Sequence, residues 1–481
     1  MKKGSITIFA VFCMLSVMSA VFLLLEAARY YGLEWYTDQK SRQCVEYVAA
    51  EYQPYLWDKF HILLLDGAYG TENFESGKLA GRIQKAAGKN RNSGFLDAEM
   101  NRIYTPEYTL ATDLDGEVFL AMIAAYQKQL LLTGEVQKLY KICEEQDAIK
   151  DNGTEVDAQI EQAKEELEQA KNKLQEEGQQ PPVIENNPLE TGNELKNALK
   201  YSVLDWLLPE GARLSGLQMN LSENIENRTL EEGTRTIVTG ESLDERILVL
   251  KYAEEVFSCY GKEKQDHLYA YELEYLVAGK EKECENLETV VKKMLRNRLA
   301  ANVTHILSDP EKMEEAWATA RSIAGCTGNP WIIMGVKSAL VGSWAYAESI
   351  LDMRSLLSGE KIPLIKSKEQ WTLGLFELQK AFQRDVKAKV CENGNSYETY
   401  ISQMLFFSEK RELAYRMMNV MEQHLKMTEQ YANCQMDHML VSFGCEMEFA
   451  SEPFFSELSF LDSHKTKKYY WKKKEEFSYI P

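Results

Sequence analysis

The sequence predicts an α+β protein that is mainly helical, with an N-terminal transmembrane helix that continues as a long stem. Residues 5–25 carry no charged side chain, and a helix of that length crosses the hydrocarbon core of a bilayer. Several later segments repeat apolar residues at helical spacing, whereas residues 439–449 alternate as a strand does. We therefore expect a mixed extracytoplasmic domain after the stem.

The charges beside the apolar run predict its orientation. Lys2 and Lys3 precede it and Glu26 follows it, so the positive-inside rule places the N-terminus in the cytoplasm and the bulk of the chain outside. A cleavable signal peptide begins in a similar way, but its apolar core is shorter, and Met18 stands where cleavage after Ala20 requires a small residue. We favour an uncleaved, single-pass anchor whose partner is the lipid bilayer.

Residues 26–53 are expected to extend the same helix beyond the membrane as a stem. They contain no proline, and Pro54 is the first helix breaker. A helix over residues 5–53 has a length of about 73 Å at 1.5 Å per residue. Apolar or aromatic residues recur in the stem close to helical spacing, at Ala27, Tyr31, Trp35, Val45, Val48 and Tyr52, which supports a continuous helix.

Composition restricts the possible functions. The chain has 481 residues, 55 Lys and Arg against 74 Asp and Glu, and a net charge of −19, which argues against nucleic acid as a partner. A hydrophobic content of 45% excludes a wholly disordered chain.

Residues 54–192 are expected to form a mixed region with a helical hairpin at about 117–178. Its first helix covers 117–132, and a loop containing proline follows the second. The second helix has a short heptad pattern of the coiled-coil type at Val156, Ile160, Ala163, Leu167, Ala170 and Leu174. The hairpin either packs within the chain, which so few heptads favour, or projects towards a partner.

Residues 193–481 are expected to form a mainly helical ectodomain with C-terminal strands and a basic tail. Helices are predicted over 195–208 and 243–257 and through most of 267–358. A strand at 439–449 is expected to pair with some of the segments 109–112, 234–238 and 469–479. Residues 331–351 resemble a second span in hydropathy, but Lys337 and Glu348 favour a buried core helix with a polar stripe.

The sequence contains no recognisable catalytic motif, so we predict no enzymatic activity, no catalytic residue, no cofactor and no metal. Carboxylates are too numerous for any pair to stand out as an acid–base couple. Glu272, Glu274 and residues 281–285 are expected to form a solvated helical face. His61, within an apolar patch, is expected to be an interior histidine.

Nine cysteines are too few for a disulfide scaffold. Cys434 and Cys445 are a candidate disulfide pair, and buried thiols are the alternative. Together with His438 they come nearest to a metal site, but their spacing fits no zinc pattern.

The C-terminal tail is basic although the chain is acidic. Its six lysines are interleaved with Tyr469, Tyr470 and Trp471, and they are Lys465, Lys467, Lys468, Lys472, Lys473 and Lys474. They form either a contact for a polyanion such as a wall polymer, or an edge strand that lysine protects from aggregation, and we favour the edge strand.

The N-terminus MKKGSITIFAVF, with the later string LLEAARYYG, resembles pilin-like proteins of tight-adherence (Tad) pili in Gram-positive bacteria. The resemblance implies a basic leader at residues 1–4, cleavage between Gly4 and Ser5 by a prepilin peptidase, and a helix that serves as anchor and assembly stem. Phe9 stands at the fifth mature position, where type IV pilins carry Glu.

The chain also resembles an uncharacterised Firmicute family of anchored proteins found beside such pilus genes. The resemblance is carried by the strings DGEVFLAMIAAY (115–126), YELEYLVAG (271–279), AGCTGNPW (324–331), SWAYAESILDMRSLLSGEKIPL (343–364) and SYETYISQML (396–405). It implies a structural or assembly component of a Tad-type pilus or secretion system, with other pilin-like subunits or assembly proteins as partners. The alternative is a surface-anchored binding module for wall polymer or host ligand, and an ectoenzyme has the least support.

Overall fold

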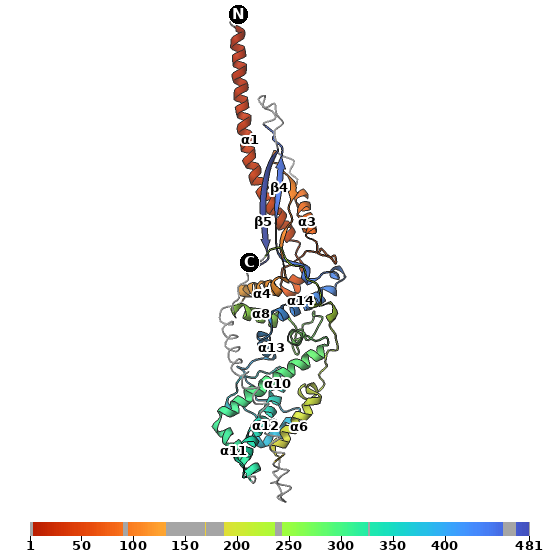
Figure 1. The fold of residues 1–481 in the computed structure, drawn as a ribbon, viewed down its shortest axis with the longest axis vertical. Helices are drawn as coiled ribbons and strands as arrows, with labels where there is room; N and C mark the ends of the chain where they lie inside the picture. Colours follow the sequence, from red (N-terminus) through yellow and green to blue (C-terminus); the bar gives the residue numbers. More distant parts are fainter. Residues whose placement is uncertain are drawn as a thin grey trace. The chain divides into compact units, whose positions relative to one another are not determined.

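The computed structural model describes residues 3–89, 95–130, 169, 187–235, 243–325, 328–455 and 468–480. The chain forms two compact units. Unit 1 comprises Met1–Ala125, Ile225–Gly240 and Met418–Pro481, and unit 2 comprises Tyr126–Asn224 and Glu241–Met417. Helices predominate and one small antiparallel sheet is present, in agreement with the predicted α+β class (Figure 1). The heptad segment lies outside the described residues.

Unit 1 begins with α1, Lys3–Ala49, a single helix that covers the predicted apolar run and most of the predicted stem. It ends four residues earlier than expected, and Gln53 then caps α2, Pro54–Phe60, by accepting a hydrogen bond from the Tyr55 amide at 3.3 Å. His61 is exposed at the end of α2, so the prediction of an interior histidine was wrong. Its backbone is left-handed, with φ 54°, because it terminates the helix.

The sheet of unit 1 is built around β4, Met439–Ser451, which confirms the strand predicted at 439–449. This strand pairs antiparallel with every other strand of the sheet, and Phe443 lies opposite both Tyr108 and Phe477. Its partners include the two predicted segments near 109–112 and 469–479, and they are β1 (Leu65–Asp66), β2 (Glu99–Ile103), β3 (Glu107–Leu110) and β5 (Tyr469–Ser478). Thr234 and Arg235 lie beside β3 without forming a strand, and residues 236–238 are outside the described residues.

The C-terminal half of α1 and the helix α3, Ser76–Lys89, pack on one face of the sheet and form its core (Figure 1). Buried residues of α1 recur at helical spacing through Leu33, Thr37, Ser41, Val45 and Val48. Of the stem residues at helical spacing, Val45 and Val48 belong to this buried face, and Tyr31 and Trp35 do not. Tyr31 and Trp35 are 70% and 64% exposed, because the sheet covers the opposite side of the helix there.

The remaining elements of unit 1 are mostly short. They are η1 (Asp113–Gly116), most of α4 (Glu117–Leu130), η3 (Ile225–Asn227), the C-terminal half of α14 (Lys410–Lys426), η7 (Glu429–Tyr431) and η8 (Met436–His438). The described part of the predicted helix 117–132 is thus helical.

Unit 2 is helical, and α10 (Glu283–Ser308) and α12 (Pro330–Leu357) form its centre. The helix predicted over 195–208 is divided at Ser202, whose φ of −158° is not helical. The other elements are α6 (Pro188–Tyr201), α7 (Val203–Leu207), η2 (Leu221–Glu223), α8 (Leu243–Val256), α9 (Glu272–Ala278), α11 (Pro310–Ala324), η5 (Lys368–Gln370), η6 (Leu375–Phe382), α13 (Tyr397–Phe406) and the start of α14.

The helix α12 contains the apolar segment 331–351 and packs against α10, α11 and α6. Asn329 caps it by accepting the Trp331 amide at 3.0 Å, and Pro330 occupies its first turn. Glu348 is completely buried within unit 2, as expected of a core helix with polar residues on one side. Among the described residues, α1 is the one helix long and apolar enough to cross a membrane.

Candidate functional site

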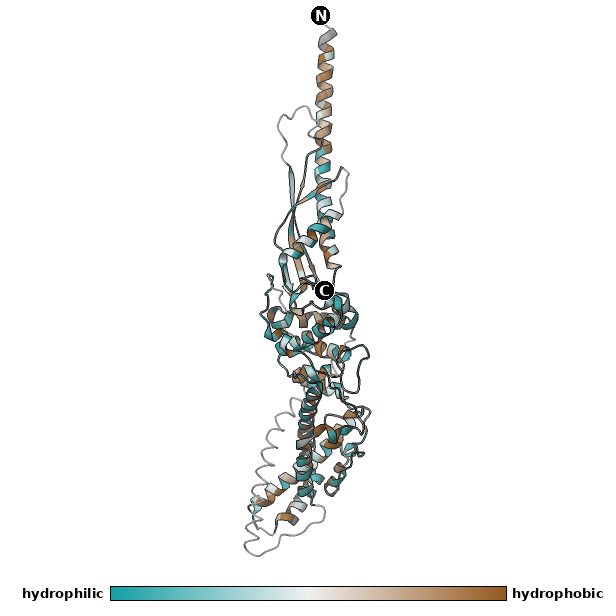
Figure 2. Ribbon diagram, turned by 90° about the vertical axis from the view of Figure 1, so that its right-hand side faces the viewer, coloured by the Kyte–Doolittle hydropathy of each residue, from teal (hydrophilic) through white to brown (hydrophobic). Residues whose placement is uncertain are grey.

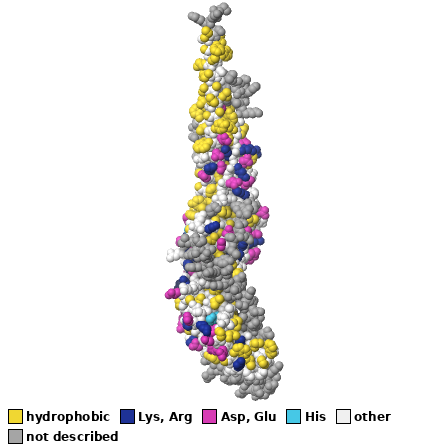
Figure 3. Space-filling model, turned by 90° about the vertical axis from the view of Figure 1, so that its left-hand side faces the viewer, with side chains coloured by type: hydrophobic (Ala, Val, Ile, Leu, Met, Phe, Trp, Pro, Cys, Tyr) yellow, Lys and Arg dark blue, Asp and Glu magenta, His cyan; other side chains and the backbone are white. Residues whose placement is uncertain are grey.

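The N-terminal half of α1 presents an apolar surface that the described residues leave uncovered (Figures 2 and 3). Ile6, Phe9, Phe12 and Leu24 are 67–72% exposed, and only 6% of the most apolar 18-residue stretch of α1 is buried. Gly4 and Ser5, the two residues of the predicted leader junction, lie in the first turns of α1. An apolar helical surface of this kind suits a bilayer or partner helices and no aqueous chemistry.

The boundary between the exposed and packed halves of α1 is marked by Glu26 and Arg29, which form an ion pair at 3.2 Å. Glu26 accepts hydrogen bonds from the amides of Phe454 and Phe455, at 3.1 and 2.6 Å. Arg29 donates to the carbonyl oxygens of Phe95 and Glu452 at 2.8 and 2.9 Å. These bonds attach the segments beside β2 and β4 to α1 where its charge-free run ends.

The basic tail becomes β5, which pairs with β4 and with no other described strand. Lys465 and Lys467 lie outside the described residues. Each described lysine of the tail contacts a carboxylate within 3.4 Å: Lys468 with Glu452, Lys472 with Glu446, Lys473 with Asp38 and Lys474 with Glu107. Their ammonium groups therefore form cross-strand and helix-to-strand ion pairs, and the described part of the tail offers no separate cationic patch.

Unit 2 contains a buried network of four charged side chains. Arg298 of α10 donates to Asp352 of α12 at 2.8 and 3.0 Å, and Lys366 forms ion pairs with both Asp352 and Glu348. Glu348 also accepts the amides of Thr372 and Leu373, both at 3.0 Å. Two cations and two anions give the network no net charge.

The cations of this network favour the ionised form of Asp352. Burial alone opposes ionisation of Asp352, but the Arg298 and Lys366 charges outweigh it and lower the pKa of the carboxyl below its usual value. The remaining Arg298 donors reach the carbonyl oxygens of Pro363 and Leu364 and the Tyr400 hydroxyl at 2.7–3.0 Å. The network ties α10, α12 and the following loop together and has no solvent-facing group that could react.

The carboxylates predicted to form a solvated face are instead buried in unit 2, so that prediction was wrong for Glu272, Glu274 and Glu283. Glu272 accepts the Ser258 amide at 2.9 Å and contacts His267 Nδ1 at 2.6 Å. Glu283 accepts the Tyr271 amide at 2.8 Å and binds the Ser215 hydroxyl. They face inward because each occupies the first turn of a helix and satisfies amides of the preceding loop.

Glu274 lies in the same group, completely buried, and accepts the Tyr397 hydroxyl at 2.9 Å and the Tyr260 amide at 3.0 Å. Burial is the largest cause that raises its pKa from 4.5 to about 7, against the lowering effect of its hydrogen bonds. Since the folded chain holds this proton more tightly than the unfolded chain, the stabilising effect is complete below pH 4.5 and is lost as the pH rises through 7.

We expect Glu274→Gln to remove this pH dependence. The wild-type free energy of unfolding should fall by about 3 kcal/mol between pH 4.5 and 7 through this group, and the variant should lack that slope. Urea denaturation of the full chain in detergent, followed by tryptophan fluorescence across this range, measures it. Glu288→Gln on the exposed side of α10 is the control and should keep the wild-type slope. Equal slopes in all three proteins would contradict the assignment.

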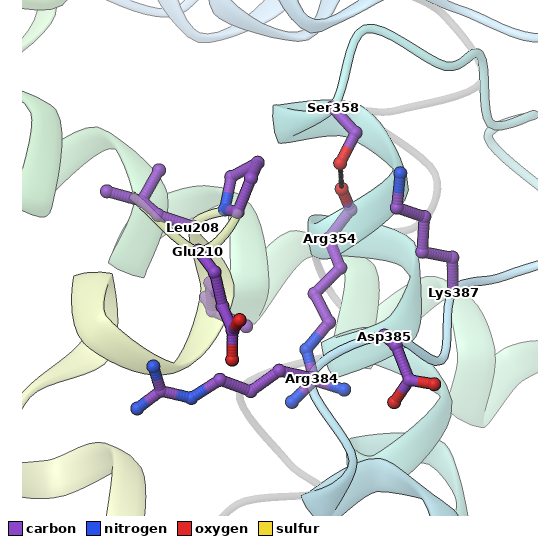
Figure 4. A pocket seen from close by; sticks show the side chains of 9 residues that line it. Leu208, Glu210, Arg354, Ser358, Arg384, Asp385 and Lys387 are labelled. Atoms are coloured by element: carbon purple, nitrogen blue, oxygen red, sulfur yellow. Dashed lines mark hydrogen bonds between the residues drawn. The ribbon is translucent and has the colours of Figure 1, made fainter. Parts of the chain in front are cut away.

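A pocket of about 470 Å³ in unit 2 is lined by apolar side chains from Leu207 to Pro209, by cationic side chains and by the carboxylates of Glu210 and Asp385 (Figure 4). Arg354 lies in it but is 2% exposed, and its guanidinium donates to the carbonyl oxygens of Trp206, Ala381, Gln383 and Val386 at 2.7–3.3 Å. Burial and the nearby Arg384 charge lower the pKa of Arg354 to about 10. Because at least four of its five N–H bonds hold the chain, Arg354 fixes these loops rather than presenting a group to a ligand.

The cysteines provide neither the candidate disulfide nor a zinc site among the described residues. Cys434 and Cys445 are both buried thiols, as the alternative prediction stated. Cys434 precedes β4 and contacts Asp66 at 3.4 Å, whereas Cys445 lies in the middle of the strand. Because Asp66 pairs with Met439, Cys434 lies near the start of β4. The six residue steps from Met439 to Cys445 span about 20 Å, too far for a disulfide or a shared ion.

The sequence did not predict the buried charge network, the pocket or the contacts at the Glu26–Arg29 boundary. A signal for the network was present, because Glu348 and Asp352 lie four residues apart in an otherwise apolar helix and therefore share a face. Their cationic partners come from segments 54 and 14 residues away, at Arg298 and Lys366, and no local pattern identifies them.

Comparison with known proteins places the chain in a family without assigning an activity. No curated protein matches it, and no solved structure does. A family of unknown function, DUF5702, matches residues 178–451, which is more than half of the 481 residues. The chain therefore belongs to DUF5702.

Proposed function

We propose that the chain is a membrane-anchored, pilin-like structural or assembly component of a Tad-type pilus or secretion system. The observation that carries the proposal is the division of α1 into two halves. Its N-terminal half exposes apolar side chains in an uncharged run, and its C-terminal half is part of the core of unit 1. One rigid helix thus joins an apolar anchor to the folded head, unit 1. An anchored filament subunit needs this arrangement.

In this proposal residues 5–25 span the bilayer once, with the N-terminus in the cytoplasm and both units outside. Lys3 at the start of α1 and Glu26 at the end of the charge-free run agree with that orientation. The partners are lipid and the apolar helices of other pilin-like subunits or assembly proteins. The resemblance of residues 1–12 to Tad pilin-like N-termini supplies the assignment to this class of system.

A binding module for an anionic wall polymer or host ligand is the alternative function. It depends on the lysines of the basic tail, and the four that are described already contact carboxylates. The proposal of a structural component therefore has more support.

Intact-mass spectrometry of the full chain extracted from its native membrane tests the proposal. We expect a mature N-terminus at Ser5, and we expect Gly4→Val, which alters the predicted cleavage site, to retain Met1 or Lys2. An unprocessed N-terminus in the wild type would contradict pilin-like processing and leave a plain anchored protein. A mature start near Val21 would identify a cleaved signal peptide and overturn the anchor.

A further inference from the structure

Three phenylalanines form an exposed cluster at the boundary between the two halves of α1. Phe95 precedes β2, and Phe454 and Phe455 follow β4. Their ring centroids are 5.1–5.8 Å apart, so the three rings are in mutual contact. Phe95 is 64% exposed and Phe454 is 47% exposed, so the cluster presents a contiguous apolar patch of the kind that marks a contact surface.

The position of the cluster along α1 is fixed by hydrogen bonds within unit 1. Glu26 accepts the amides of Phe454 and Phe455, and Arg29 donates to the carbonyl oxygen of Phe95. Ser451 adds a bond to the Asp97 carbonyl oxygen at 2.8 Å, which joins the two segments that carry the rings. The rings are therefore held at the level of Glu26, the first charged residue after the apolar run.

Further aromatic side chains lie at the same end of the sheet. Tyr30 contacts Tyr469 and Trp471, each with ring centroids 5.2 Å apart, and Tyr470 is 54% exposed. The exposed ion pair of Lys468 with Glu452 lies at this end of the β4–β5 pair. Aromatic rings accompanied by charged groups are typical of the interfacial zone of a bilayer, where both find suitable surroundings.

We propose that Phe95, Phe454 and Phe455 form a membrane rim, which inserts into the interfacial zone of the bilayer beside the point where α1 leaves it. This inference rests on the proposed function, because it requires α1 to span the membrane. Its occupant is lipid: headgroups and the upper parts of acyl chains. The rim gives unit 1 a second membrane contact and restricts the tilt of α1 and unit 1 relative to the bilayer.

The small size of the rim favours lipid over a second copy of the chain. A phenylalanine ring buries at most about 200 Å², so these partly covered rings offer under about 400 Å² together. A stable protein interface needs about 800 Å² from each partner. The rim adjoins the surface of α1 that faces lipid in the proposed function. Insertion into a bilayer requires no minimum contact area of this kind.

Photocrosslinking of the full chain in vesicles of equal parts phosphatidylcholine and phosphatidylglycerol tests the rim. The photoreactive analogue p-benzoylphenylalanine replaces Phe454 or Phe95 in separate variants, so that a local disturbance at one position does not decide the outcome. Phe12, 67% exposed within the charge-free run, is the position for the anchor. Tyr47, 44% exposed and 21 residues beyond Glu26, is the matched control at about 31 Å along the helix.

We expect lipid adducts at positions 454 and 95 to approach the yield at position 12 and to exceed the yield at position 47 several-fold. Adducts at position 12 with only background at 95 and 454 would overturn the rim and leave the anchor intact. Crosslinks from 95 or 454 to a second chain instead of lipid would also overturn it. Background yield at position 12 itself would overturn the membrane anchor and hence the proposed function.

Discussion

Replacing Asp352 with alanine is expected to lower the stability of unit 2 by about 3–5 kcal/mol, because the change leaves two buried cations without their shared anion. Arg298 and Asp352 are at most 1% exposed, and Lys366 is in the same buried network. Arg298 would keep only neutral acceptors, and Lys366 would keep Glu348. Hydrogen exchange of the α10 and α12 amides, measured by mass spectrometry on the full chain in detergent, reports this loss within unit 2.

A control for this variant lies on the same helix. Glu288 and Lys292 form an ion pair at 2.6 Å on the surface of α10, where both side chains are 38–50% exposed. Glu288→Ala should change the protection of α10 by less than about 1 kcal/mol, since water screens an exposed pair. If Asp352→Ala had an effect as small as this control, the buried network would not hold the two helices together.

Buried ion pairs are important for the stability of this protein because the described residues form no disulfide. Seven of the nine cysteines are described, and all seven are thiols. Burial raises the pKa of the Cys44 thiol to about 11, and burial followed by the Asp66 charge raises that of Cys434 to about 12, so neither is reactive at neutral pH. Stability must come from the two cores and from paired charges within each unit.

The sequence predicted those features that depend on local pattern. The long α1, the helices through residues 243–357 and the strand at 439–449 follow from charge-free runs, helical spacing and alternation. Helical spacing did not identify which face of the stem is buried. Tyr31 and Trp35 are spaced as helical core residues are, but the two strands that contact α1, β4 and β5, come from residues more than 400 positions away and pack on the other side.

The partners of the charged residues in the candidate sites could not be predicted from local pattern either. Glu272 and Glu274 were predicted to be solvated because acidic residues at helix starts are commonly exposed. Their partners are instead the amides of Ser258 and Tyr260, which lie 14 residues earlier in the chain. The lysines of β5 were expected to lie on an edge strand, but their carboxylate partners on α1 and on β3 could not be identified from the sequence. Charge in the linear sequence identifies the residues that need a partner, and tertiary packing decides which partner each one has.

Arg228→Ala should have the second large effect, in unit 1, with an expected loss of about 3–4 kcal/mol. The Arg228 guanidinium lies between Glu422 and Asp437, bound to Asp437 at 2.7 Å and to Glu422 through both terminal nitrogens. These carboxylates are 2% and 5% exposed, and Glu422 also accepts the Met436 amide at 2.9 Å just before β4. Removing the guanidinium would leave the buried Asp437 carboxylate without this cation. Glu422 would keep its ion pair with Lys426.

The same segment supplies a matched control in Arg235, which forms an ion pair with Glu476 of β5 at 2.8 Å, with side chains 35% and 40% exposed. Arg235→Ala should cost less than about 1 kcal/mol, so the two variants separate burial from charge removal. Hydrogen exchange of the β4 amides is the measurement, because β4 begins two residues after Asp437 and is part of the core that packs against α1.

Arg228→Lys should recover only part of the loss, since an ammonium group lacks the planar fork that reaches both carboxylates. Equal protection in Arg228→Ala and Arg235→Ala would mean that the buried triad does not stabilise the head that the stem carries.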